Sequence, residues 1–239
     1  PYAPGDVGGS VGSCLVHLSK HFDTFENLKN PYIGPKYSNL YVKNLINKNQ
    51  NSSRFKIFYE EDDVLFNLIV ERLMNKEVIG FFNSNLEFGA RALGNRSIIA
   101  SPCFIDMKEI INSKIKKREN FRPFAPAIME EDKLEWFKKK HQNPFMSNVE
   151  DIIEKKRNII PAVTHVDGTG RVQTVSEKTN PRFYNLIKNF KKKTNVPILL
   201  NTSFNENEPI VLKPEEAINC FERTKMDALV IENYLFSRK

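Results

Sequence analysis

Four short polar segments, far apart along the chain, constrain how this sequence can fold. They span residues 87–97, 112–126, 165–174 and 200–205. Each combines arginine, lysine, serine, threonine or asparagine with glycine, proline or phenylalanine. Guanidinium, ammonium, hydroxyl and amide groups bind oxyanions, and glycine lets a backbone approach a ligand closely. A fold that unites these segments builds a pocket for a small, highly anionic ligand, and we expect such a pocket.

The net charge alone excludes few classes of function. The chain has 239 residues, with 36 Lys and Arg against 29 Asp and Glu, a formal net charge of +7 and a pI near 9.2. Such a pI permits nucleic-acid binding. However, the lysine runs 138–140 and 191–193 follow amphipathic helical patterns, and we interpret them as solvated helix ends. Aromatic and basic residues do not interleave as they do in RNA-recognition modules, so nucleic acid is a disfavoured partner.

Membrane association and a disulfide framework are not expected either. No apolar run approaches the 18 residues that a membrane-spanning helix requires. The three cysteines, Cys14, Cys103 and Cys220, are widely spaced and odd in number, which fits a reducing cytoplasm. The first residues show neither an initiator methionine nor a signal-peptide pattern. We interpret this beginning as a cut inside a larger protein.

Hydrophobic periodicity and turn signals predict alternating helices and strands. Residues 37–60 are rich in asparagine and serine and are interpreted as a linker that ends in a short strand. Further helices are expected at 62–75, 107–116, 131–140, 181–192 and 213–224, and strands at 55–59, 78–82, 97–100, 125–129, 162–166, 172–175, 197–200 and 228–231. Several strand pairs flank glycine turns, so an α/β fold with a mixed sheet is favoured over a fully parallel one.

The basic element from Lys116 to Arg122 is the strongest local signal. Arginine can hold a phosphate or a carboxylate with two parallel bonds, whereas lysine supplies a point charge. A run of basic residues on a helix is usually surface. Here, however, Phe121 and Phe124 lie beside two prolines and are expected to bury the segment. A buried Arg122 would need an anionic partner, which favours a binding role.

Two later segments add candidate groups. Asn201 to Asn205 directly follow an apolar strand, and polar groups at the carboxyl end of a strand are well placed to meet a ligand. A plain Asn-rich turn is the alternative interpretation. His165 and Asp167 would share one face if they lie on a strand. Arg171 follows two glycines, which favours phosphate, although an isolated histidine is more often structural.

The N-terminal region offers weaker signals. Asp6 lies between glycines in a turn, which by itself indicates a turn or the neighbourhood of a metal or phosphate. His17 and His21 are four residues apart and can share a helix face, the spacing of some metal sites. The flanking glutamate of a zinc protease is missing, so exposed helix-end residues are the favoured interpretation.

Several motifs together resemble the O-carbamoyltransferases of the NodU/CmcH family, which includes the tobramycin carbamoyltransferase. The matching segments are Glu87-Phe-Gly-x-Arg-Ala-Leu-Gly-Asn-Arg-Ser-Ile98, Ile115-Lys-x-Arg-Glu-x-Phe-Arg-Pro-Phe-Ala-Pro126, Pro144-Phe-Met146, His165-Val-Asp-Gly-Thr-x-Arg-x-Gln-Thr-Val175, Asn201-Thr-Ser-Phe-Asn205 and Glu208-Pro-Ile-Val211. They keep the order found in the family and cover residues 78–239.

The resemblance implies a two-domain enzyme of which this chain is the later part. Residues 1–40 would be the end of an actin/sugar-kinase-like domain, 41–60 a linker and 61–239 a YrdC-like domain with a twisted mixed sheet flanked by helices. In such enzymes the YrdC-like site makes carbamoyl-adenylate from carbamoyl phosphate and ATP, with Mg²⁺ accompanying ATP. The other domain, which holds Fe²⁺, moves the carbamoyl group to a hydroxyl of a small-molecule acceptor such as a sugar or natural product.

The resemblance also assigns roles to individual residues. The residues expected to be catalytic are Lys116, Arg122, Arg171 and Ser203. Those expected to bind substrate or nucleotide are Arg91, Arg96, Ser97, Arg118, His165, Asp167, Asn201, Thr202 and Asn205. Asp6 matches an aspartate ligand of the iron, whose histidine partners would lie upstream of this chain.

The sequence also permits two other functions. The YrdC-like fold also serves threonylcarbamoyl-adenylate synthesis for tRNA modification, which would use threonine and bicarbonate in place of carbamoyl phosphate. A non-catalytic nucleotide- or RNA-binding module is the third possibility, and its binding would fall steeply with salt.

Overall fold

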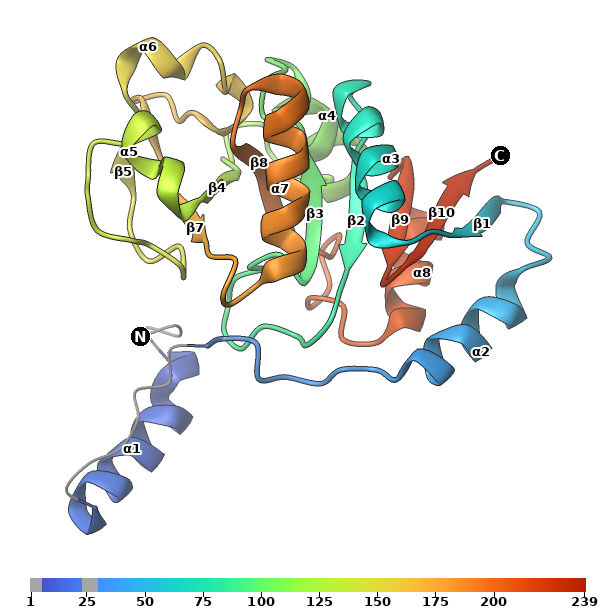
Figure 1. The fold of residues 1–239 in the computed structure, drawn as a ribbon, viewed down its shortest axis with the longest axis horizontal. Helices are drawn as coiled ribbons and strands as arrows, with labels where there is room; N and C mark the ends of the chain where they lie inside the picture. Colours follow the sequence, from blue (N-terminus) through green and yellow to red (C-terminus); the bar gives the residue numbers. More distant parts are fainter. Residues whose placement is uncertain (1–5, 23–29) are drawn as a thin grey trace.

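The fold is built around one eight-stranded mixed sheet with helices on both faces (Figure 1). The computed structural model describes residues 6–22 and 30–239. The sheet runs in the order β1-β10-β9-β2-β3-β8-β4-β7, in which β9/β2 and β4/β7 are parallel pairs and all other neighbours are antiparallel. The predicted α/β class and mixed sheet are therefore confirmed.

The element bounds agree with most of the expected pattern. The sheet strands are β1 (Phe55–Tyr59), β2 (Ile79–Phe82), β3 (Arg96–Ala100), β4 (Ala125–Met129), β7 (Gln173–Val175), β8 (Ile198–Ser203), β9 (Ala228–Ile231) and β10 (Tyr234–Arg238). The longer helices are α1 (Gly9–His21), α2 (Asn39–Asn49), α3 (Asp62–Met74), α7 (Pro181–Thr194) and α8 (Pro214–Arg223). The shorter elements are η1 (Asp6–Gly8), α4 (Met107–Ile111), the π-helical turn η2 (Asn112–Lys116), η3 (Glu130–Asp132), α5 (Lys133–Trp136), β5 (Glu150–Asp151), α6 (Glu154–Arg157), η4 (Pro161–Val163) and β6 (Thr169–Gly170).

The core lies between the sheet and its helices. In Figure 1, α3 and α7 lie side by side in front of the sheet, and α8 lies behind it. All residues of β2, β3, β4 and β9 are buried, as expected for central strands covered on both faces. Helix α7 begins with Asn180, whose side chain accepts a hydrogen bond from Phe183 N, and with Pro181 at a position that tolerates proline.

Three sequence-based predictions of secondary structure are wrong. Residues 39–49, expected as part of a linker, form the helix α2, whereas the strand expected at the end of that linker occurs as β1 and pairs with β10 in the main sheet. Residues 162–166 form no strand, because they lie in η4 and the turn after it. The expected helix at 131–140 ends at Trp136, since Phe137 instead bridges Ile152.

Strand β10 of the main sheet was not foreseen, and neither were the two-residue strands β5 and β6. Strand β10 was missed because only Glu232 and Asn233 separate it from β9, and Glu232 has a positive φ of 50° that closes this tight hairpin.

The N-terminal region has a different character from the sheet domain. Within its described part, α1 has no buried residue, and His17 and His21 are exposed on one face with ring centroids 4.5 Å apart. This agrees with their interpretation as surface residues. Helix α2 buries Val42 and Ile46. The assignment of residues 1–40 to a preceding domain stays a prediction.

No helix in 6–22 or 30–239 has the length and apolarity to cross a membrane.

Candidate active site

The polar segments meet at one edge of the sheet. Strand β8 ends there at Ser203, which lies opposite Ser97 at the start of β3, and Asn201 lies opposite Ala125 at the start of β4. Strand β7 begins beside β4, with Ala127 opposite Gln173. The carboxyl end of β8 and the loops that lead into its neighbours therefore form one surface, as ligand sites of α/β sheets usually do.

A cationic cleft lies at this edge. It consists of two adjoining cavities of about 340 and 110 Å³ that share Arg118, Pro123, Phe124 and Arg171. The remaining lining residues of the larger cavity are Arg122, Val149 and His165, and those of the smaller are Ala90, Arg91, Ala92, Ala125, Met146, Asn201, Thr202 and Ser203. Eight of the predicted site residues thus line one cleft: Arg91, Arg118, Arg122, His165, Arg171, Asn201, Thr202 and Ser203.

The arginines of the cleft are poorly neutralised. Within residues 6–22 and 30–239, neither Arg91 nor Arg171 has a hydrogen-bond acceptor or a carboxylate partner. Burial, and then the charge of Arg91, lowers the pKa of Arg171. Arg118 uses Nε to donate to Asn112 Oδ1 at 2.8 Å and packs on the Phe124 ring. Positive charges held together without counter-charges favour an anion that binds between them.

The loop that carries Arg91 is organised by Glu87. One carboxylate oxygen of this buried residue accepts hydrogen bonds from the backbone amides of Leu93, Asn95 and Arg96 at 2.7–3.1 Å. Gly94 has a φ of 109°, and a Cβ there would lie 2.2 Å from the Phe183 ring, so only glycine fits without rearrangement. The loop is therefore a preorganised support for Arg91.

The same loop is tied to the strands beneath it. Gln173 Nε2 donates to Leu93 O at 2.8 Å, and Asn201 Nδ2 donates to Ala92 O and to Gln173 Oε1 at 3.0 and 2.9 Å. These bonds fix the orientation of the Asn201 amide. Its Oδ1 atom is shielded from solvent and has no hydrogen-bond partner in the described part of the chain. Asn201 thus supports the loop, lines the smaller cavity and carries an unpartnered acceptor.

Lys116 lies behind the cleft and lines neither cavity. It ends the π-helical turn η2, a feature often found at functional sites. Its buried ammonium donates to Ser203 O, Asn205 O and Asn205 Oδ1 at 2.6–2.8 Å. Burial lowers the pKa of Lys116 to about 7, with the charge of Arg118 as a smaller cause. Lys116 thereby holds the end of β8 and the Asn205 loop in place.

Arg122 differs from its sequence-based prediction. The segment was expected to be buried by Phe121, yet Phe121 is 77% exposed, and just over half of the Arg122 side chain is exposed. Arg122 pairs with Glu119 at 3.1 Å across one turn. Only Phe124 packs inward, because the chain enters β4 at the next residue. Arg122 therefore lies at the solvent rim of the cleft.

His165 and Asp167 lie in a turn that returns to β6, not on a strand. Gly168 N donates to His165 O, and His165 N donates to Thr169 O, which closes the turn. Gly168 has a φ of 80°. Asp167 is exposed, lines neither cavity and accepts hydrogen bonds from Thr169 N and Oγ1. Of the two, only His165 faces the cleft, because the turn breaks the alternation that a strand would impose.

Arg96 and Ser97 were expected to bind substrate. In the structure their side chains instead make hydrogen bonds to other groups of the protein. Arg96 is fully buried, and its Nη1 atom donates to the carbonyl oxygens of Asn83, Ser84 and Asn95 at 2.7–3.2 Å. Its guanidinium also lies 3.6 Å from the Phe82 ring centroid. Ser97 Oγ accepts from Gly94 N at 3.0 Å. Neither residue lines the cleft, so both act by shaping the loop.

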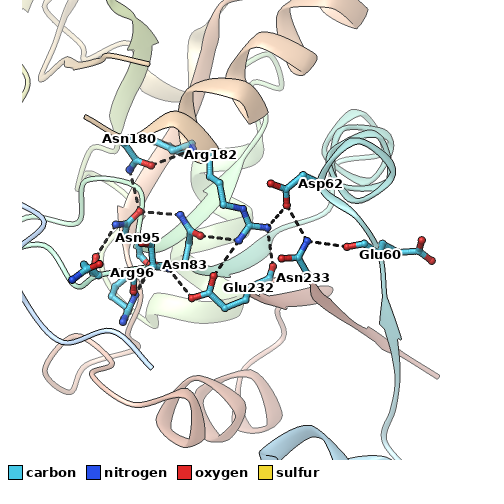
Figure 2. A network of polar contacts seen from close by, with 12 residues as sticks. Glu60, Asp62, Asn83, Asn95, Arg96, Asn180, Arg182, Glu232 and Asn233 are labelled. Carbon is cyan, nitrogen blue, oxygen red and sulfur yellow. Dashed lines mark hydrogen bonds and ion pairs between the residues drawn. The ribbon is translucent and has the colours of Figure 1, made fainter. Parts of the chain in front are cut away.

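A second arginine network lies along the same edge of the sheet, over β2 and β9 (Figure 2). Arg182, near the start of α7, donates to Asn83 Oδ1, Asp62 Oδ1 and Glu232 Oε2 at 2.7–3.2 Å. Asn95 Oδ1 accepts from the side chains of Asn83 and Asn180. This network joins α3, α7, the loop before β3 and the turn after β9.

Several residues that build the site were missed from the sequence. Glu87 and Gln173 stand inside the motifs quoted above, but nothing in a single sequence tells a carboxylate that binds backbone amides from one that binds ligand. Asn143 was missed as well. It accepts from Ser147 N and donates to Asn148 O, which holds the loop that supplies Met146 and Val149. The buried pair Lys133–Glu150, at 2.8 Å, anchors the same loop.

The metal prediction falls outside what can be described. Asp6 begins the turn η1, and its side chain lies outside the described residues. Among residues 6–22 and 30–239, no three His, Cys, Asp or Glu side chains form a group that could hold a metal ion.

Comparisons with known proteins agree with the fold and the motifs. The nodulation protein NolO of Bradyrhizobium diazoefficiens is 42% identical over 243 residues, 99% of this chain and 44% of NolO. The 3'-hydroxymethylcephem-O-carbamoyltransferase of Amycolatopsis lactamdurans is 37% identical over 135 residues, 56% of this chain and 25% of that enzyme.

A solved structure shares the fold at low sequence identity. The crystal structure of full-length HypF in the phosphate- and nucleotide-bound form has a TM-score of 0.50 and 15% identity, covering 71% of this chain and 25% of HypF. The first relatives by sequence are all longer, and this chain spans 35–45% of their length. Residues 70–238 match the family described as Carbamoyltransferase C-terminus. The chain therefore belongs to the carbamoyltransferase family and carries its C-terminal region.

Proposed function

We propose that this chain is the adenylate-forming part of an ATP-dependent O-carbamoyltransferase. Carbamoyl phosphate and ATP are its substrates, and carbamoyl-adenylate is its product. The carbamoyl group then moves to a hydroxyl of a small-molecule acceptor on the remaining part of the complete protein. The name of the cephem relative, an O-carbamoyltransferase, supports the reaction class. The HypF structure is a phosphate- and nucleotide-bound form, which supports the ligand class.

The observation that carries this proposal is the convergence of Arg91, Arg118 and Arg171 on one cleft. They come from three separate segments, and Arg91 and Arg171 have no acceptor among the described residues. Arginine is the side chain best suited to bidentate recognition of phosphate. An arginine trio without counter-charges fits a substrate pair that carries several phosphate groups.

The reaction needs charge stabilisation more than covalent chemistry. Water splits carbamoyl phosphate into carbamate and phosphate. A carbamate oxygen then bonds to the α-phosphorus of ATP, while the bond from that phosphorus to the pyrophosphate oxygen breaks. Negative charge gathers on the phosphoryl oxygens, and fixed cations stabilise it without reorganising. In this proposal Arg118 and Arg171 hold phosphoryl oxygens, Ser203 and Thr202 contact them from β8, and Lys116 fixes the end of β8.

Magnesium fits this site only as part of the nucleotide complex. No carboxylate lines the cleft, and no metal-binding group of three occurs within 6–22 or 30–239. We therefore expect Mg²⁺ to be held by ATP phosphates and water, as this ion usually is. Bound in that way, it supplies charge neutralisation at the phosphates. Iron belongs, in this proposal, to the preceding domain of the complete enzyme.

The proposal is tested by pyrophosphate release from the purified chain with ATP, Mg²⁺ and carbamoyl phosphate, each omitted in turn. We expect release that requires all three. Threonine plus bicarbonate, offered in place of carbamoyl phosphate, tests the alternative threonylcarbamoyl-adenylate reaction and should give none. Pyrophosphate release that persists without carbamoyl phosphate, or no binding of carbamoyl phosphate by the folded chain, would contradict the proposal.

A further inference from the structure

A chain of three side chains leads from the surface into the cleft. Asp167 Oδ1 lies 2.7 Å from Thr169 Oγ1, and Thr169 Oγ1 lies 3.0 Å from His165 Nδ1. The turn that contains them is closed by two backbone hydrogen bonds, from His165 N to Thr169 O and from Gly168 N to His165 O. His165 itself is half-buried and lines the larger cavity beside Arg171.

The direction of the hydrogen bonds follows from the chemistry of the three groups. An ionised carboxylate only accepts, and hydrogen bonds from Thr169 lower the pKa of Asp167, so it is ionised. The Thr169 hydroxyl therefore donates its single proton to Asp167. Its oxygen must then accept from His165, which places a proton on Nδ1. In neutral His165 the lone pair consequently lies on Nε2.

Burial and the nearby positive charges disfavour the protonated form of His165. Burial lowers its pKa, and the positive charges of Arg171 and Lys108 act in the same direction, whereas Asp167 opposes them. The Nε2 atom is shielded from solvent and has no hydrogen-bond partner among the described residues. An acceptor of this kind is unfavourable unless a ligand supplies a donor.

A second unused acceptor lies in the same cleft. Asn201 Oδ1 is also shielded and unpartnered, and its orientation is fixed because Nδ2 donates to Ala92 O and Gln173 Oε1. The residues that line the cleft thus include arginine donors for an anion and, separately, two side chains with unpartnered acceptors. Inorganic phosphate alone would satisfy the first set only.

We propose that His165, held with its proton on Nδ1 by Thr169 and Asp167, accepts a hydrogen bond from the amino group of a carbamoyl ligand and so selects carbamoyl over other acyl phosphates. This proposal rests on the proposed function, since it assigns specificity within that site. His165 is a specificity residue in this view, and the phosphate affinity belongs to the arginines. Acetyl phosphate, which has a methyl group in place of the amino group, is the matched poor ligand.

The first test reads the imidazole directly. Long-range ¹H–¹⁵N correlation spectra of the labelled chain distinguish a protonated Nδ1 from a protonated Nε2. We expect the Nδ1–H form of His165 in the wild-type chain and a shift towards the Nε2–H form in Thr169→Val. An Nε2–H form in the wild-type chain would overturn the proposal, whatever the activity of the chain.

The second test compares dissociation constants for carbamoyl phosphate, acetyl phosphate and inorganic phosphate by calorimetry. We expect the wild-type chain to prefer carbamoyl over acetyl phosphate by about tenfold, the size of one hydrogen bond to a buried acceptor. His165→Phe and His165→Asn should bind inorganic phosphate as the wild type does, yet lose this preference. His165→Asn keeps a donor for the Thr169 hydroxyl, so it preserves the turn if His165→Phe misfolds. His21→Phe, at an exposed position in α1, is the control for a histidine substitution outside the cleft.

The outcomes separate this inference from the proposed function. If the folded chain binds neither carbamoyl nor acetyl phosphate, both are overturned. If it binds carbamoyl phosphate and the preference survives in His165→Phe and His165→Asn, only the role of His165 is overturned. Loss of the preference in these two variants alone, together with the Nδ1–H form in the wild type, supports the inference.

Discussion

Two groups of arginines lie along the same edge of the sheet and differ in what surrounds them. Arg96 and Arg182, over β2 and β9, donate to backbone carbonyls, amides and carboxylates supplied by the fold (Figure 2). Arg91 and Arg171, beside the end of β8, have no such partner within 6–22 or 30–239. The residue type is the same, so the difference lies in whether the fold supplies the acceptors.

This difference separates a structural role from a binding role. A buried guanidinium whose terminal nitrogens donate to groups of the fold stabilises it and leaves few donors for a ligand. A guanidinium whose donors face a cleft beside another positive charge lowers stability slightly and favours an incoming anion.

Removing an arginine that donates to several groups of the fold should destabilise the protein most. Arg96→Met keeps apolar volume over Phe82 but leaves carbonyl oxygens of Asn83, Ser84 and Asn95 without their donor. We expect the free energy of unfolding to fall by about 3 kcal/mol, as for other buried networks, measured by urea denaturation. Arg91→Met is the matched control and should change it by less than about 0.5 kcal/mol. Equal losses of stability in both variants would contradict a structural role specific to Arg96.

Removing an unpaired arginine should affect binding instead. Arg171→Ala should weaken inorganic phosphate binding by roughly 10- to 100-fold, the range for a hydrogen bond to a charged group. Its free energy of unfolding should stay the same or rise, since the repulsion with Arg91 disappears. Calorimetry and urea denaturation measure the two effects. Arg223→Ala, which removes a partly exposed arginine paired with Glu206 and Glu208, serves as the binding control.

Lys116 should make stability depend on pH. Its pKa falls from the ordinary 10.5 to about 7 in the folded chain, so between these values the unfolded chain binds more protons. Stability should therefore rise with pH across this window, and the cost of burying the charge is fully present below pH 7. Denaturation midpoints at pH 7 and 9 should show a smaller rise in Lys116→Met than in the wild type. An identical rise in both chains would contradict this assignment.

The smallest effect is expected at the rim of the cleft. Arg122 is about half exposed and paired with Glu119, so solvent screens it and its donors are partly used. Arg122→Ala should weaken phosphate binding by no more than about threefold, well below the effect of Arg171→Ala. The same calorimetric titration measures it. A loss as large as that of Arg171→Ala would place Arg122 at the centre of the site.

Much of the fold was visible in the sequence because the central strands and helices carry strong periodic signals. The helix 62–75 and the strand 78–82 were expected almost as they occur, since the burial of α3 and β2 is regular. The helix at 39–49 was missed because its composition is polar and only Val42 and Ile46 are buried. Such a helix depends on tertiary contacts that a linker-like composition conceals.

The site was predictable as a set of residues but not as a set of roles. Glycine and arginine motifs identified Arg91, Arg118, Arg171 and the end of β8, and these do converge. Arg96 belongs to the same motif as Arg91, and only the partners of each side chain show that one is structural. Likewise, the position of Phe121 in an aromatic and proline-rich segment suggested burial, whereas the turn before β4 leaves it in solvent.

The most direct test of this account is a crystal structure of the chain with carbamoyl phosphate bound. The phosphate group should lie between Arg118 and Arg171, with Arg96 and Arg182 keeping the partners described above. A phosphate found on Arg182, or one that leaves Arg91, Arg118 and Arg171 without contact, would contradict the claim that unpaired arginines mark the active site.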